Sequence, residues 1–283
     1  MSIIRVDRTK CISCSACVKV CPMGVLAMEF MLGSGCTPFD AAAPKALHPE
    51  KCIRCGHCVA VCPKGAMDHA AAPLSKQVLI GENDIPDPET AVKFLRSRRS
   101  VRVYKKEPLP KETLLRLLDI ARFAPSGTNV RRLSYLVISD RDRLNRVTEA
   151  TVDWLDKELN RPGSKMPAGF REPVDEYRKG RDALLRGAPH LISALTSPEN
   201  LAVCADSAKF ALEYVELLAS AMGVGACWMG IVQLCARKRY PPLMEAMQVP
   251  EDKSVVGILT VGYPEYRYRR LVDRDPLEVH WIQ

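Results

Sequence analysis

The sequence predicts an α+β protein of two domains joined by a short linker. Its 283 residues exceed the usual length of one domain. Nine of the twelve cysteines fall between Cys11 and Cys62, and hydrophobic patterns of helix and strand alternate in the remainder of the chain. We therefore predict a cysteine-rich domain over residues 1–72, a linker over 73–90 and a larger domain over 91–283, in which helices pack on a central sheet.

Composition excludes several broad classes of protein. Hydrophobic residues make up 47% of the chain and charged residues 26%, which excludes an intrinsically disordered or purely fibrous chain. The net charge of +8 favours anionic partners without predicting nucleic-acid binding. No run of eighteen uncharged apolar residues occurs, and Arg5, Asp7 and Lys10 stand where a signal peptide needs its apolar segment. We expect a cytoplasmic protein that binds neither membranes nor nucleic acid.

The cysteine-rich segment contains an internal repeat, offset by 41 residues from Lys10 to Lys51. Each copy has the pattern Cys-x2-Cys-x2-Cys-x3-Cys-Pro and is followed two residues later by a glycine, Gly24 or Gly65. Three thiolates on one tight loop can bind three corners of an iron–sulfur cubane, but that loop cannot easily reach the fourth corner. The proline and the glycine permit a turn that directs the chain back across the repeat.

This spacing resembles that of bacterial ferredoxins with two 4Fe-4S clusters, in which the cysteine before proline binds the other cluster. The resemblance implies two ligand sets, Cys11, Cys14, Cys17 and Cys62 for one cluster and Cys52, Cys55, Cys58 and Cys21 for the other. A disulfide framework would need an oxidising compartment, and structural zinc normally uses two separated Cys-x2-Cys pairs. We interpret Cys36 as an incidental thiol and His57 as a residue that lies on the surface or tunes the cluster potential.

Capping residues and hydrophobic periods predict the elements of the second half. Asp87 and Pro88 form an N-cap and first turn, so a helix should run from there to about Arg96. A second helix begins near Pro110 and ends before Pro125. A long helix covers about residues 202–222, and its predicted buried stripe consists of Phe210, Tyr214, Leu217, Leu218 and Ala221. Strands are predicted over two β-type runs, 133–139 and 190–196, and over the apolar run 255–262, which should be buried on both faces.

Four loop motifs accompany these elements in a fixed order. They are Arg98-Arg99-Ser100-Val101-Arg102, Ala124-Pro125-Ser126-Gly127-Thr128-Asn129, Gly223-Val224-Gly225-Ala226-Cys227-Trp228-Met229-Gly230 and Gly262-Tyr263-Pro264. Each motif alone is weak, because basic runs are commonly solvated and Pro-Ser-Gly is a common helix exit. In this order they resemble the nitroreductase family of flavoproteins over about residues 91–283. The whole chain resembles the subgroup with a fused N-terminal ferredoxin domain.

The resemblance implies FMN as the second cofactor and a homodimer as the assembly. The implied contacts are Arg98, Arg99, Ser100 and Arg102 for the phosphate, ribityl chain and pyrimidine edge, Ser126 and Asn129 for a flavin across the dimer interface, Trp228, Met229 and Gly230 beside the flavin N5 and O4, and Arg269 and Arg270 for the phosphate. Guanidinium groups suit a phosphate dianion by charge and by their fork geometry. For the C-terminal arginines, a solvated basic run stays the alternative.

Two segments depart from the family or vary within it. Where the family commonly shows Gln-Pro and an aromatic residue, this chain has Arg131, Arg132 and Leu133, which makes the flavin rim more cationic and suits an acidic substrate. The segment 153–188 corresponds to the variable lid of the family. It is interpreted either as a surface excursion of helices or as part of a substrate site.

These parts predict an FMN-dependent oxidoreductase. Electrons are expected to pass through the two 4Fe-4S clusters, to collect in pairs on FMN and to leave to a small organic acceptor, a nitroaromatic, a quinone or an activated alkene. The donor, a redox protein or NAD(P)H, is left open, since no Gly-x-Gly-x-x-Gly motif follows a strand. No catalytic acid or base is predicted. The alternatives are a non-enzymatic electron-transfer or redox-sensing module and, less favoured, a zinc-bearing nucleic-acid binder.

Overall fold

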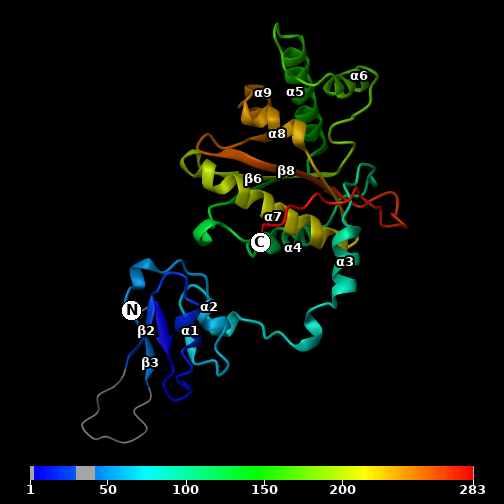
Figure 1. Ribbon diagram of the computed structural model, residues 1–283. Coiled ribbons are helices and arrows are strands. Elements are labelled where there is room, and N and C mark those ends of the chain that lie inside the picture. Colours follow the sequence, from blue (N-terminus) through cyan, green and yellow to red (C-terminus); the bar gives the residue numbers. More distant parts are fainter. Residues whose placement is uncertain (1–2, 30–41, 283) are drawn as a thin grey trace, which may run out of the picture. The chain divides into compact units, whose positions relative to one another are not determined.

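The computed structural model describes residues 3–29 and 42–282, which form two compact units (Figure 1). Unit 1 comprises Met1–Ile85 together with Thr128–Val130, and unit 2 comprises Pro86–Gly127 together with Arg131–Gln283. Cys36 lies outside the described residues. The predicted linker contains two single 3-10 turns and the start of the first helix of unit 2.

Unit 1 is built from short elements that repeat in the same order as the cysteine motifs. These elements are β1 (Ile4–Val6), α1 (Ala16–Lys19), β2 (Leu26–Glu29), β3 (Ala43–Ala46), α2 (His57–Ala60) and β4 (Met67–His69). Strands β1 and β4 form one antiparallel pair, and β2 and β3 form another. Helices α1 and α2 are offset by the same 41 residues as the motifs, so the sequence repeat is also a structural repeat.

The backbone of the two loops confirms this correspondence. Ser13 and Arg54, one per copy, have φ angles of 55° and 56°, and Gly24 and Gly65 both have a φ of 58°. A positive φ is unfavourable for residues with a Cβ, so its recurrence at matched non-glycine positions shows that both loops adopt one specific conformation.

Unit 2 is a larger α+β unit around one four-stranded sheet. Its elements are α3 (Pro88–Ser97), α4 (Lys111–Ala121), β5 (Ser134–Ile138), α5 (Arg141–Asn160), α6 (Glu172–Arg178), β6 (His190–Thr196), α7 (Leu201–Ala221), β7 (Gly225–Trp228), α8 (Gly230–Arg237), α9 (Pro241–Met247) and β8 (Ser254–Gly262). The strand order is β5-β6-β8-β7, and all three pairings are antiparallel. Asp87 caps α3 as predicted, accepting a hydrogen bond from the Thr90 backbone amide at 3.1 Å.

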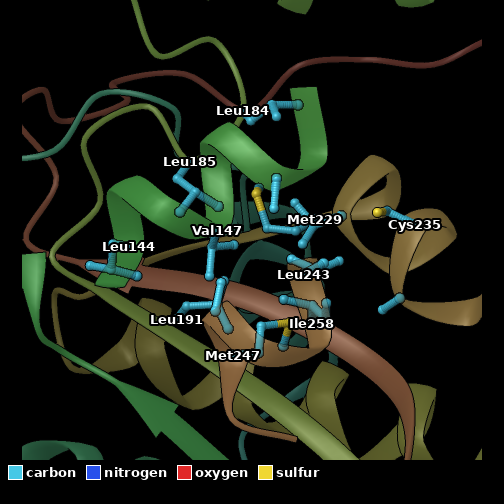
Figure 2. Packing of buried hydrophobic residues seen from close by; sticks show 14 of the residues in the cluster. Leu144, Val147, Leu184, Leu185, Leu191, Met229, Cys235, Leu243, Met247 and Ile258 are labelled. Carbon is cyan, nitrogen blue, oxygen red and sulfur yellow. The ribbon is translucent and has the colours of Figure 1, made fainter. Parts of the chain in front are cut away.

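Helices cover both faces of this sheet (Figure 1). All seven residues of β6 are buried, including the polar His190, Ser193 and Thr196, so both faces of this strand are covered. Helices α5, α8 and α9 pack on one face, where Val147, Leu243 and Met247 meet Leu191 of β6 and Ile258 of β8 (Figure 2). Helices α4 and α7 pack on the other face. The predicted arrangement of helices on a central sheet is therefore confirmed.

The predicted buried stripe of α7 is wrong. Phe210 is 51% exposed and Tyr214 is also exposed, while a neighbouring stripe is buried, consisting of Cys204, Ala208, Ala211, Leu212, Val215 and Ala219. Both stripes have the helical period, so periodicity alone does not distinguish them. The buried stripe is rich in small residues, which let α7 approach the sheet closely. At Gly257 of β8, a Cβ atom would lie 2.5 Å from Leu212 Cδ1.

The variable segment 153–188 is only partly a surface excursion. It begins in the middle of α5, and five of its side chains, Trp154, Leu155, Val174, Leu184 and Leu185, are buried in the core cluster. Elements α5, β7, α8 and α9 were not among the predicted elements. Helix α5 has a clear start signal, since the Asp140 side chain accepts a hydrogen bond from the Arg143 amide at 2.8 Å.

Candidate functional site

The eight cysteines of the two motifs line two cavities in unit 1. One cavity is lined by Cys11, Cys14 and Cys17 of the first loop together with Cys62 of the second motif. The other is lined by Cys52, Cys55 and Cys58 of the second loop together with Cys21 of the first motif. Each cavity thus takes three sulfurs from one loop and a fourth from the other, which is the crossed arrangement that the ferredoxin resemblance implies.

The fourth cysteine of each set is held by the turn that follows it. The Val25 amide donates to Cys21 Sγ at 3.3 Å, and the Ala66 amide donates to Cys62 Sγ at 3.2 Å. These two bonds occupy matched positions of the repeat. Backbone N–H groups directed at sulfur favour the thiolate form, which is the form that binds iron.

The negative charge of these sulfurs, once they are thiolates, must be balanced by a cationic group among them. Burial raises the pKa of Cys17, and the neighbouring Cys62, Cys11 and Cys14 raise it further. Burial likewise raises the pKa of Cys58, to about 11. Four thiolates around one cavity repel each other unless iron compensates their charge. A cubane has four iron corners, so sulfurs that surround a cavity fit it. Within residues 3–29 and 42–282, no three His, Cys, Asp or Glu side chains converge on a single-ion site.

Two histidines lie near the second cavity. His57, which was interpreted as a surface or tuning residue, is exposed at the start of α2 and lines the cavity. His69 is 1% exposed, and its Nε2 atom lies 3.4 Å from Cys52 Sγ. His69 was not among the predicted site residues; it stands in β4 (Met67–His69), shortly after Cys62 of the second motif.

In unit 2, the segment 98–102 runs beside strand β7. Ser100 pairs with Ala226 in a parallel bridge, and the Val101 amide donates to the Ala226 carbonyl at 2.9 Å. A Cβ atom at Gly225 would lie 2.7 Å from the Val101 side chain, so this position needs glycine for the two segments to approach. The sequence motifs 98–102 and 223–230 are therefore brought together as neighbours.

A cavity of about 710 Å³ opens beside this contact. Its lining includes Arg98, Arg99, Lys105, Glu216 and Arg267. Its size lies within the range of small-molecule sites, and four cationic side chains suit an anionic ligand such as the phosphate of FMN. Lys105 and Arg267 were not predicted, because neither belongs to a motif and only the fold brings them to the cavity.

Arg98 lies between two carboxylates of α7. Its Nη1 atom is 3.4 Å from Glu216 Oε1, and its Nε atom is 3.6 Å from Glu213 Oε1. Glu216 is 6% exposed, and burial raises its pKa to about 7, while the Arg98 guanidinium opposes this shift. Glu216 was also missed, because a buried glutamate stands out only once the sheet-facing side of its helix is known, and the sequence did not identify that side of α7.

A second cavity of about 650 Å³ has a largely apolar lining that includes three charged residues. Trp228 and Gly230 line it together with Phe170, Ile231 and Leu234, and Lys209, Glu213 and Arg237 contribute charged groups. Phe170 belongs to the variable segment 153–188, which therefore reaches a cavity. Glu213 lines this cavity and Glu216 lines the other, so Arg98 contacts a residue of each.

The remaining predicted flavin residues lie apart from both linings. Arg102 is exposed, and its Nη1 atom donates to the Ser100 carbonyl at 3.4 Å. Met229 is buried, and its amide donates to the Ile258 carbonyl at 2.9 Å. Ser126 is half-buried after α4, and Asn129 Nδ2 donates to the Ile53 carbonyl within unit 1 at 2.8 Å. Arg269 and Arg270 are exposed in the C-terminal segment.

In the described residues, no helix combines the length and the apolar character that crossing a bilayer requires.

Comparison with known proteins identifies two regions. Residues 95–263 match the model of the nitroreductase family, and residues 10–66 match that of a 4Fe-4S dicluster domain. An iodotyrosine deiodinase of Thermotoga neapolitana is 26% identical over 60% of this chain and 86% of that protein. An FMN reductase (NAD(P)H) of Bacillus subtilis is 24% identical over 62% of this chain and 66% of that protein.

A solved structure supports the fold of the larger region. The nitroreductase with bound FMN from Desulfitobacterium hafniense superimposes with a TM-score of 0.55 at 18% identity, covering 68% of this chain and 97% of that one. The matches confirm the resemblance and the fold class predicted from the sequence.

Proposed function

The chain belongs to the nitroreductase family, whose members are oxidoreductases, and carries a 4Fe-4S dicluster domain at its N-terminal side. From this premise we propose that it is an FMN-dependent enzyme that takes electrons through two 4Fe-4S clusters and reduces a small organic acceptor. The observation that carries the proposal is the presence, in one chain, of two four-sulfur cavities and a cation-lined cavity of about 710 Å³.

The ligand sets of the clusters are the two crossed sets. Cys11, Cys14, Cys17 and Cys62 bind one cluster, and Cys52, Cys55, Cys58 and Cys21 bind the other. The amides of Val25 and Ala66 stabilise the fourth thiolate of each set. The chain thus supplies two sites, each built from both halves of the repeat, which keeps the clusters close enough for electron exchange.

The FMN site uses the arginine segment and residues of a second copy of the chain. Arg98, Arg99, Ser100 and Arg102 bind the phosphate, ribityl chain and pyrimidine edge, Trp228, Met229 and Gly230 lie beside the ring, Arg269 and Arg270 add charge at the phosphate, and Ser126 and Asn129 act across a homodimer interface. FMN, when bound, accepts single electrons and releases them in pairs. The separate positions of these residues in one chain are consistent with a site that needs two copies.

The lining of the second cavity supports the proposed acceptor class. Phe170, Trp228 and Leu234 offer an apolar surface for an aromatic ring, and the two cations Lys209 and Arg237, against one carboxylate, Glu213, favour an acidic group. Nitroaromatics, quinones and activated alkenes are the candidates, and those with a carboxylate should be preferred. The donor is a reduced redox protein or NAD(P)H, and the name of the Bacillus subtilis relative, FMN reductase (NAD(P)H), supports testing the latter.

The test uses the full chain purified without oxygen. Iron, acid-labile sulfide and FMN are measured first, and the protein is then reduced with reduced ferredoxin, with NADPH or with dithionite. Nitroaromatic, quinone and enone acceptors are added in turn, each with and without a carboxylate. Reoxidation of the flavin with formation of the reduced product supports the enzyme. If the flavin is reduced but no small acceptor reoxidises it, the protein is an electron-transfer module.

A further inference from the structure

The second copy of the repeat ends in a buried histidine that contacts a predicted cluster ligand. His69 is the last residue of β4 and pairs with Ile4 of β1. Both nitrogens of its ring have partners, since the Ala71 amide lies 3.0 Å from Nδ1 and Cys52 Sγ lies 3.4 Å from Nε2. All of these residues belong to unit 1.

The backbone partner decides which ring nitrogen carries the proton. A backbone amide can only donate, so Nδ1 of His69 is the acceptor of the Ala71 N–H and carries no proton itself. The proton of the imidazole must then be on Nε2. Nε2 faces Cys52 Sγ, so the histidine donates an N–H···S hydrogen bond to that sulfur. The Arg54 amide, at 3.4 Å, is a second donor to Cys52 Sγ.

In the described part of the first copy, the position equivalent to His69 carries no hydrogen-bond donor. With the offset of 41 residues, Cys52 corresponds to Cys11 and His69 corresponds to Met28 of β2. A thioether has no N–H group and cannot donate. The backbone donors to Cys21 and Cys62 are matched between the copies, whereas Cys52 has the His69 ring and the Arg54 amide as additional partners.

The charged residues of the two copies do not all favour the same cluster. Arg54 in the second loop stands where the first loop has Ser13, and His57 stands where it has Ala16. In the opposite sense, Lys64 lines the cavity of Cys11, whereas the neutral Met23 stands at the matched position of the other cavity. The side chains of Arg54, His57 and Lys64 are exposed, so water screens their charges, and the N–H donor is the difference on which the inference rests.

We propose that His69 makes the two clusters unequal, raising the reduction potential of the cluster bound by Cys52, Cys55, Cys58 and Cys21 so that it is reduced before the other. An N–H donor stabilises the extra negative charge that reduction places on the cluster and its thiolates. This inference rests on the cluster ligation proposed above. It assigns the site where the first electron resides to the second copy of the repeat.

The test is a redox titration of the full chain, monitored by electron paramagnetic resonance. His69→Met makes the second copy like the first, and the higher potential should fall while the lower stays, so that the two converge. One neutral hydrogen bond lost corresponds to about a tenfold change in the reduced-to-oxidised ratio at fixed potential, which is about 59 mV for a one-electron couple. His69→Gln, which keeps an N–H donor, should retain more of the difference. His48→Gln, an exposed control, should change neither potential.

A second measurement uses the unmodified chain, so that its result does not depend on whether the His69 variants fold. In protein labelled with 15N-histidine and reduced by one electron, pulsed magnetic resonance should detect coupling of the cluster spin to a histidine nitrogen, and His69→Gln should abolish it. Absence of this coupling, or two unchanged potentials in His69→Met with a full iron content of about eight atoms per chain, overturns the inference. Absence of iron from the unmodified protein would instead overturn the proposed function.

Discussion

The two units encode their candidate sites in different ways. In unit 1, eight sulfurs come from two short loops, and the ferredoxin resemblance of their spacing already implies which of them share a cavity. In unit 2, the lining of the 710 Å³ cavity comes from segments as far apart as Arg98 and Arg267. A site made by a local motif is readable from sequence, whereas a site made by tertiary contacts is readable only in part.

The units also differ in what stabilises them. The described core of unit 1 has seven buried residues, two of which, Cys17 and Cys58, are predicted metal ligands. Unit 2 has two large apolar clusters, one on each face of its sheet. A small core leaves little margin of stability, so we expect unit 1 to depend on its clusters and unit 2 to fold without them. The predictions below test this contrast, beginning with the largest effect.

Removing one cysteine ligand should have the largest effect and should be confined to unit 1. Cys55→Ser should lose about half of the iron and sulfide and destabilise unit 1, because a serine cannot replace a thiolate at a cubane corner. FMN content should stay unchanged. Iron, sulfide and FMN per chain are measured together. Cys36→Ser is the matched control and should keep all three, and full iron in Cys55→Ser would contradict the ligand assignment.

Removing Arg98 should weaken FMN binding without affecting iron. Loss of a charge-assisted contact of about 1.5–3 kcal/mol lowers affinity by roughly 10- to 100-fold. The dissociation constant of FMN is measured by flavin fluorescence for Arg98→Ala and Arg98→Lys, and the lysine variant should be intermediate because it retains charge opposite Glu216. Arg161→Ala, which loses only an exposed ion pair with Glu158, is the control. Equal affinity in all variants would remove Arg98 from the flavin site.

A substitution at Gly225 tests whether FMN binding requires the close contact between segments 98–102 and 223–230. In Gly225→Ala the new Cβ meets the Val101 side chain at 2.7 Å, so the segment 98–102 must shift. Overpacking of this kind typically costs about 1–3 kcal/mol of unfolding free energy. Stability is measured by urea denaturation, and FMN affinity should fall as well. At Gly169 a Cβ meets nothing within 4 Å, so Gly169→Ala should leave both quantities nearly unchanged.

Much of the fold was predictable from the sequence because its signals are local. The cap at Asp87 predicts where a helix begins, and the β-type run 190–196 predicts a strand. Neither prediction needs information from the rest of the chain. The buried face of α7 was not predictable, because two stripes of the same period compete and only the close approach at Gly257 selects the one with small residues. Periodicity identifies a helix but not always its inner face.

The residues of the candidate sites also fall into two groups, those that the sequence predicts and those that only the fold brings together. The cysteine sets are implied by the ferredoxin resemblance, and the proximity of segment 98–102 to strand β7 agrees with the resemblance to nitroreductases. Lys105, Glu216 and Arg267 carry no motif, so only the packing of α7 and the last strand reveals them. His69 was missed because its role depends on the register of β4, which places the ring beside Cys52.

The smallest predicted effect concerns the buried carboxylate of unit 2. Burial raises the pKa of Glu216 to about 7 in the folded chain, above its ordinary value of 4.5. The folded state therefore binds more protons than the unfolded state between these values, so stability is highest below pH 4.5 and is lost as pH rises through 7. Between pH 6 and pH 8 the free energy of unfolding of unit 2 should fall by about 1 kcal/mol from this group. Glu216→Gln should remove this fall, while Glu213→Gln should only lessen it, because burial is the main cause of the raised pKa of Glu216 and the neighbouring Glu213 a smaller one. Urea denaturation at both pH values, followed by tryptophan fluorescence, measures the difference. An identical pH slope in the Glu216→Gln chain would mean that Arg98 keeps the carboxylate ionised throughout, and the cavity would then carry one more negative charge at neutral pH than we expect.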